Sequence, residues 1–164
     1  LGLLQLYSVT GSASAPAIAT LSPRPSSTPW NFNNLSAPQL GSTKKIATND
    51  DRIQNAEFRN NRLWVTQTIK LPAGSNTVVP TRIASKWWEI NAATGITVQS
   101  GVVEAPTGAV HYYFPSIAVN KDNDVLMLND PMLDGIDDPE SDLARIERTV
   151  NLHPRDWFRP FAPG

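Results

Sequence analysis

Apolar and β-branched residues are concentrated in the middle of the chain. Residues 62–69 are rich in β-branched and aromatic side chains, and residues 85–90 contain a pair of tryptophans. A glycine-containing turn at 91–95 separates the second run from a third run at 96–103. Strand, turn and strand in this order are typical of a β-hairpin. Since no helical periodicity appears between residues 46 and 129, the pattern predicts antiparallel β-sheet.

An internal repeat is the most informative feature of the pattern. Residues 53–65 align with residues 114–127, with one residue inserted in the turn, and Phe58 and Val119 take the same place in the two copies. Each copy consists of an apolar strand, a polar turn and a second apolar strand. Repeated supersecondary units of this kind are typical of propellers and solenoids. We therefore expect a four-stranded antiparallel blade over about 52–104, followed by the start of a second blade.

Composition divides the chain into three regions. Residues 1–45 begin with a strand-like run and continue as a connection rich in Pro and Ser, in which Trp30 and Phe32 are expected to anchor onto a neighbouring surface. Prolines exclude a central strand or a helix interior there. Residues 46–129 form the blade region. Residues 130–164 contain an acidic loop, a short helix and an extended aromatic tail.

The C-terminal helix is expected over about 139–150. Asp138 before a proline is a favourable N-cap. Leu143, Ile146 and Val150 then form one apolar stripe.

Composition and charge narrow the function classes. Of the 164 residues, 40% are hydrophobic and 18% are charged, and the net charge is -1, so we expect no nucleic-acid binding. The chain has no cysteine, which excludes disulfides and thiolate metal sites. No apolar run reaches the ~20 residues of a membrane span, so we expect no membrane insertion. A first residue other than methionine suggests a processed product or an excised segment.

Several motifs resemble those of secreted bacterial β-propeller proteins of the sialidase-like superfold. The motifs lie within about residues 3–128, at 37–41, 48–56, 63–65, 87–90, 98–101 and 112–120. The resemblance implies an all-β fold of antiparallel propeller blades and an extracellular or cell-surface location. The repeat and the hairpin turn at 91–95 predict that Trp64, Trp87 or Trp88, and Ile90 contribute to packing between blades. At roughly 60 residues a blade, the chain holds fewer blades than the minimum of about four in a closed propeller. We therefore expect an incomplete propeller, completed by other protein chains or flanking segments.

A candidate ligand site lies where two equivalent strands begin. The repeat alignment places the loop at 49–52 and the segment at 111–113 at the same rim. Carboxylates, a guanidinium and aromatic rings there could bind a carbohydrate or an acidic ligand. In the alternative interpretation an aspartate caps a turn and pairs with the arginine, while the tyrosines pack between blades. The candidate residues are Asp50, Asp51, Arg52, His111, Tyr112 and Tyr113.

Catalysis is not expected within this chain. Glycoside hydrolysis requires two positioned carboxyl groups or a tyrosine–glutamate pair. Nothing in the spacing of Glu57, Glu89 or Glu104 pairs one of them with a tyrosine, and the Ser-x-Asp-x-Gly-x-Thr-Trp box of sialidases is absent. Two hypotheses remain: a non-catalytic structural or interaction segment, or one wall of a carbohydrate-binding or glycoside-processing propeller.

The C-terminal region offers a metal site and a partner site. Asp134, Asp137 and Asp138 belong to an oxygen-rich loop that suits Ca²⁺, although their spacing matches no defined calcium loop and a solvated acidic loop is the alternative. The tail carries large aromatic residues flanked by arginines, a composition typical of protein interfaces. These aromatic residues either bind a partner or fold back onto the open edge of the same domain: Trp157, Phe158 and Phe161.

We predict that the tail contributes more to assembly than the acidic loop does. Each aromatic side chain stabilises by roughly 2–3 kcal/mol when fully buried, whereas a surface carboxylate contributes under about 1 kcal/mol. Replacing Trp157 and Phe158 with alanine should therefore weaken assembly or stability, whereas Asp134→Asn with Asp137→Asn should not, as measured by sedimentation and thermal unfolding. The opposite ranking, with calcium restoring a chelated protein, would identify the loop as a metal site instead.

Overall fold

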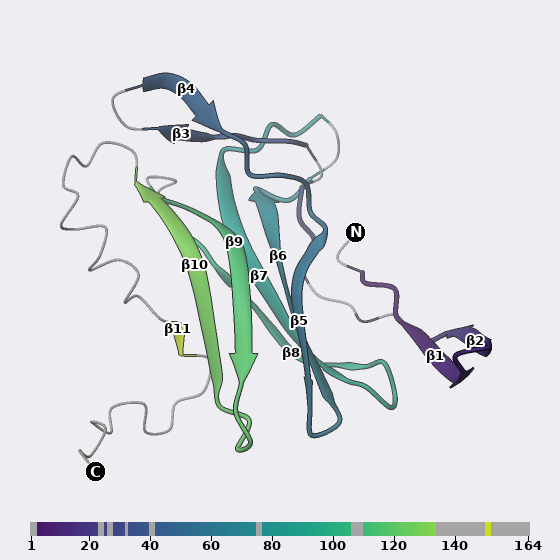
Figure 1. Cartoon of the computed structure of the whole chain (residues 1–164). Coiled ribbons are helices and arrows are strands. Elements are labelled where there is room, and N and C mark those ends of the chain that lie inside the picture. The colour runs from purple at the N-terminus through teal and green to yellow at the C-terminus, as the bar shows by residue number, and fades with distance from the viewer. Residues whose placement is uncertain are drawn as a thin grey trace, which may run out of the picture.

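A four-stranded antiparallel sheet forms the centre of the computed structural model (Figure 1). Its order is β5-β6-β7-β8, with β5 at Ile53–Arg59, β6 at Arg62–Leu71, β7 at Arg82–Asn91 and β8 at Thr97–Val103. This sheet confirms the four-stranded antiparallel unit expected over about 52–104. The structure describes residues 3–22, 25, 28–31, 33–39, 42–74, 77–105, 110–133 and 150–151, and within them the chain is all-β with no helix.

The turns of this sheet follow from residues that accept left-handed backbone angles. Asn60 and Asn61, between β5 and β6, have φ values of 48° and 59°, and Asn is one of the residues that accept this region. Gly95, between β7 and β8, has a φ of 71°. The side chain of Asn91 accepts hydrogen bonds from the N–H groups of Ala93 (3.0 Å) and Thr94 (3.2 Å). Both hairpins are thus set by local chemistry.

The two central strands, β6 and β7, are buried on both faces. Every residue at positions 64–71 and 83–90 is buried. We call the side that carries Trp64 and Trp87 the front face, and the side that carries Val65 the back face. Both faces carry large apolar side chains, and polar residues, two lysines among them, are buried between these.

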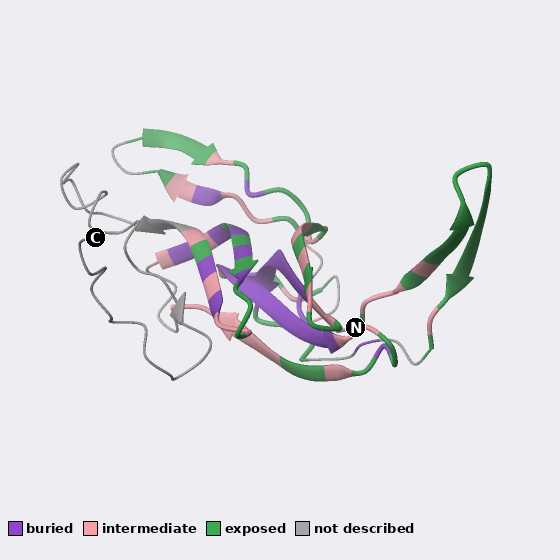
Figure 2. Cartoon of the chain, turned by 60° about the horizontal axis from the view of Figure 1, so that its bottom comes forward, coloured by how far each residue is buried: buried purple, intermediate pink, exposed green. Residues whose placement is uncertain are grey.

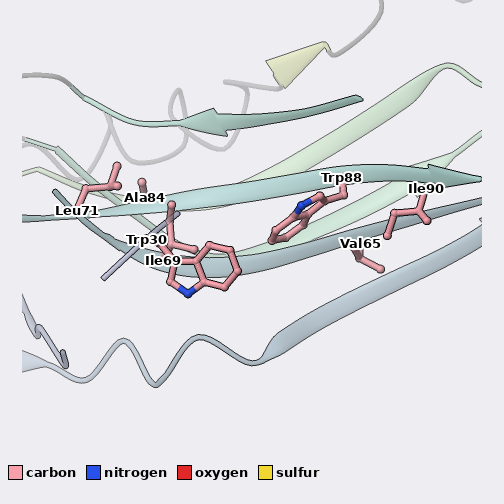
Figure 3. Close-up of a cluster of buried hydrophobic side chains, with 7 residues drawn as sticks. All are labelled: Trp30, Val65, Ile69, Leu71, Ala84, Trp88 and Ile90. Atoms are coloured by element: carbon pink, nitrogen blue, oxygen red, sulfur yellow. The ribbon is translucent and has the colours of Figure 1, made fainter. Parts of the chain in front are cut away.

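Trp30 covers the back face (Figure 3). Its ring meets that of Trp88 edge-to-face, with centroids 5.9 Å apart. The N–H of Asn31 donates to the carbonyl of Lys70 (2.9 Å) and holds the segment on β6. The expectation that Trp30 anchors the connection is confirmed, whereas Phe32 lies outside the described residues. The buried cluster consists of Trp30, Val65, Ile69, Leu71, Ala84, Trp88 and Ile90.

A second sheet covers the front face. Its order is β11-β10-β9, with β9 at Val110–Val119, β10 at Val125–Leu133 and β11 at Val150–Asn151. The rings of Trp64 and Trp87 stack with centroids 6.4 Å apart and pack against this sheet. The sheet's contribution to the cluster is Ile117, Val119, Val125 and Met127. Trp64 and Trp87 therefore pack between sheets, as expected.

The internal repeat corresponds to two hairpins, β5–β6 and β9–β10. Phe58 pairs with Leu63 in the first hairpin, and Val119 pairs with Val125 in the second, so the two residues that the alignment equates take equivalent places. The two turns are in contact, because the side-chain amide of Asn60 donates to the carbonyl of Lys121 (3.0 Å). The repeat therefore describes two hairpins whose turns lie at the same end of the structure.

Two small ribbons lie at the periphery. β1 (Tyr7–Ser12) and β2 (Ala15–Thr20) form a hairpin that projects from the body, and nearly all of it is exposed (Figure 2). β3 (Ala37–Gln39) and β4 (Ser42–Ile46) form a second hairpin near one end of the two sheets (Figure 1). The proline-rich connection thus contains β2 and β3, which its composition did not predict. Both lie in two-stranded ribbons, where an edge position tolerates proline.

The predicted C-terminal helix is not supported. Its last residue, Val150, belongs to β11 and pairs with Met127 of β10. The rest of the range 139–150 lies outside the described residues. At Val150 the pairing edge of β10 takes precedence over the weak helical pattern, because tertiary contacts override local propensity.

We predict that Trp64→Ala lowers the free energy of unfolding by about 3–5 kcal/mol, because the ring fills the contact between the two sheets. Phe58→Ala is the matched control. Phe58 lies on the neighbouring strand and is 64% exposed, compared with 1% for Trp64, so its loss should change stability by less than about 1 kcal/mol. Urea unfolding followed by tryptophan fluorescence measures both. Similar losses in the two variants would contradict the assigned packing.

Candidate functional site

A cleft of about 350 Å³ opens beside the β3–β4 hairpin. One wall precedes β3 and the other follows β4. The hydroxyl of Thr48 donates to the carbonyl of Leu35 (2.6 Å) and joins the two walls. Five of the seven lining residues are polar, so the cleft offers amide, hydroxyl and carboxylate groups to a ligand. The lining residues are Asn34, Leu35, Ser36, Ala47, Thr48, Asn49 and Asp50.

Asp50 and Arg52 form an exposed ion pair at the cleft. The guanidinium Nε of Arg52 donates to Oδ1 of Asp50 (2.7 Å), and the backbone N–H of Arg52 donates to the same oxygen (3.2 Å). These hydrogen bonds hold the pKa of Asp50 down at about 2. This geometry is that of the alternative interpretation of the sequence, in which the aspartate caps its turn and pairs with the arginine.

Asp51 belongs to a buried ion pair. The ammonium group of Lys70, which is fully buried, donates to Oδ1 of Asp51 (2.9 Å) and to the carbonyl of Asn49 (2.6 Å). Asn49 has a φ of 57°, a left-handed conformation that Asn tolerates. Burial raises the pKa of Asp51, and the bond from Lys70 opposes this effect. The pair links the cleft loop to β6.

The residues at the start of β9 lie in the interior. His111 is buried, and its Nδ1 accepts a hydrogen bond from the N–H of Ile83 (3.2 Å). Tyr113 is 1% exposed, and Tyr112 is half-buried. Leu35 connects this segment to the cleft, because it lines the cleft and packs against the cluster that contains Tyr113. Leu35 thus lies between the cleft and Tyr113, whereas the loop at 49–52 forms hydrogen bonds to Lys70 and within the loop itself.

Sequence reasoning missed a buried lysine on β7. Lys86 is fully buried on the back face, where its ammonium group donates to the hydroxyl of Thr28 (3.0 Å) and lies 5.1 Å from the ring centroid of Trp88. Burial lowers the pKa of Lys86 to about 8. A signal was present: residues 83–90 carry large apolar side chains at both odd and even positions, which indicates a strand buried on both faces.

The C-terminal candidates lie outside the described residues. These are the calcium-site residues Asp134, Asp137 and Asp138 and the tail residues Trp157, Phe158 and Phe161. In the part of the chain that the structure describes, no three His, Asp or Glu side chains come close enough to hold a metal ion. Over the same residues, no helix is long and apolar enough to cross a membrane.

We predict that Lys86 makes stability depend on pH. Its folded-state pKa of about 8 lies below the ordinary value of 10.5. Between these two values the unfolded chain binds the proton that the folded chain has released, so the free energy of unfolding rises with pH. The rise should be on the order of 1–3 kcal/mol. Urea unfolding at a series of pH values measures it.

Lys86→Met should remove that rise, whereas Lys45→Met, at an exposed position, should keep it. An unchanged pH slope in Lys86→Met would contradict the assigned burial of the ammonium group.

Comparison of the chain with family models, with curated proteins and with solved structures found no match in any of the three. The resemblance to sialidase-like propellers stays an expectation from the sequence motifs.

Proposed function

We propose that the chain is a non-catalytic structural and interaction segment of an extracellular or cell-surface β-propeller assembly. Other protein chains or flanking segments complete its stack of sheets. The location rests on the resemblance of the motifs to secreted proteins and on the low content of charged residues, 18%. The assembly role rests on how the two repeated hairpins pack.

One observation carries the proposal: the two copies of the repeat stack head to tail. Trp64 faces the second sheet, whereas its counterpart in the repeat, Leu126, pairs with the exposed Ala118 on the far side of that sheet. Val65 packs on the back face, whereas its counterpart Met127 points toward the first sheet. The front of one unit therefore meets the back of the next.

A head-to-tail contact joins the front face of one unit to the back face of the next. The last unit of a stack therefore keeps one unpaired face. A heterologous interface builds a ring if its rotation closes and an open stack if it does not. A propeller is the closed form of such a stack of sheets. The repeat packing in this chain thus supports a stack that continues beyond the second sheet.

The outer face of the second sheet is where the next unit would pack. Among the described side chains of this face are five uncharged residues, of which Phe114 and Leu128 are 41% and 43% exposed. Apolar sheet faces of this kind are stabilised by burial against another sheet. The five residues are Phe114, Ser116, Ala118, Leu126 and Leu128.

Carbohydrate binding is the second candidate function, and the polar cleft beside β3–β4 favours it. Asparagine, serine and aspartate side chains line the cleft and could bond sugar hydroxyls. Titration calorimetry with a panel of neutral and acidic oligosaccharides tests this function. Binding that is lost in Asn34→Ala would support it, and the absence of binding across the panel would remove it.

We predict that the isolated chain associates in a concentration-dependent manner through the outer face of the second sheet. Leu128→Asp should shift sedimentation toward smaller species, because burying a carboxylate in an apolar contact is costly. Val79→Asp is the matched control, since Val79 is apolar and 77% exposed but lies outside both sheets. A wild-type chain that sediments as a folded monomer at every concentration would contradict the proposal.

A further inference from the structure

The β1–β2 hairpin is an arm whose apolar side chains have no support from the body of the protein. Tyr7, Val9 and Ile18 are 60%, 69% and 70% exposed, although such residues are usually buried. All three lie on one face of the ribbon, because Val9 pairs with Ile18 and Tyr7 is two residues from Val9. A two-stranded ribbon is at best marginally stable in water, whereas three or more strands are stable.

The arm has no charged residue to block pairing with another strand. The first charged residue of the chain is Arg24, so β1 and β2 contain none. Exposed edge strands are ordinarily protected by charged side chains, proline or a covering element. Here the protection is confined to one strand, because Pro16 lies in β2 and β1 has no proline.

The position of Pro16 shows which backbone N–H and C=O groups of β1 point away from β2. Residues opposite each other in an antiparallel pair alternate between bonded and non-bonded positions. Pro16 has no N–H, so its pair with Gly11 is a non-bonded one. By alternation Tyr7, Val9 and Gly11 direct their N–H and C=O groups away from β2. The outer edge of β1 thus has an unbroken set of donors and acceptors.

We propose that the outer edge of β1 pairs with β1 of a second copy of this chain. Antiparallel pairing centred on Val9 would place Val9 opposite the same residue of the second copy and Tyr7 opposite Gly11. Each pair then exchanges both backbone hydrogen bonds. The product is a four-stranded sheet in the order β2-β1-β1-β2. Its two-fold symmetry makes it a closed dimer, in contrast to the head-to-tail stacking of the sheets.

Side-chain placement supports this register. Directly opposed residues of paired strands lie on the same face of the sheet. The apolar residues of both arms, Tyr7, Val9 and Ile18, therefore join into one stripe across four strands. The edges that remain free are the two β2 strands, each of which contains Pro16.

Proline substitutions on the two strands test the pairing edge. Leu128→Asp serves as the background in every sample, so that stacking through the second sheet does not contribute. In that background the chain should sediment as a dimer, and Val9→Pro should raise the dimer dissociation constant at least about tenfold, because it removes backbone bonds at the symmetry axis. Ile18→Pro, at the paired position on β2, should leave the dimer intact.

A single cysteine tests the register, because the chain has no cysteine of its own. Under mild oxidation Val9→Cys should form a disulfide-linked dimer, since bonded pairs have Cα atoms about 5.5 Å apart. Ile18→Cys should form much less. Fluorescence of the buried Trp64 and Trp88 verifies that each variant is folded.

A monomeric background chain would overturn the proposal, as would equal weakening by the two prolines or equal cross-linking by the two cysteines. These outcomes leave the stacking proposal untouched, because stacking is tested with Leu128 intact.

Discussion

The burial of β6 and β7 on both faces is the constraint on which the rest of this structure depends. Apolar side chains lie on both faces of these two strands, and their burial requires one covering element on each side. Trp30 and its segment cover the back face, and the second sheet covers the front face. One covering element precedes the central sheet in the chain, and the other follows it.

Burial on both faces also brings polar groups into the interior. Lys70 reaches Asp51 and the carbonyl of Asn49, so its charge is paired. Lys86 has the hydroxyl of Thr28 and the ring of Trp88 as neighbours, and its pKa falls. The two buried lysines thus differ in their partners, which are a carboxylate and a carbonyl for Lys70 and a hydroxyl and an aromatic ring for Lys86.

The two modes of association that we propose differ in symmetry and in chemistry. Stacking through the second sheet would bury side chains, and it would continue from unit to unit. Pairing through β1 would join backbone groups, and it would stop at two copies. Together they would connect two stacks through the β1–β2 arms.

The sequence determined the central hairpins by itself, because β-branched and aromatic runs with Asn and Gly turns encode local pairing. The repeat alignment also equated Phe58 with Val119, and the two residues take equivalent places in their hairpins, opposite Leu63 and Val125. The burial of Tyr113 agrees with the alternative in which the tyrosines pack in the interior. Tertiary structure alone decided that Val150 pairs with Met127 and that the buried Nδ1 of His111 accepts from Ile83. Each of these pairings joins residues distant in sequence, and no local pattern specifies which distant partner a residue meets.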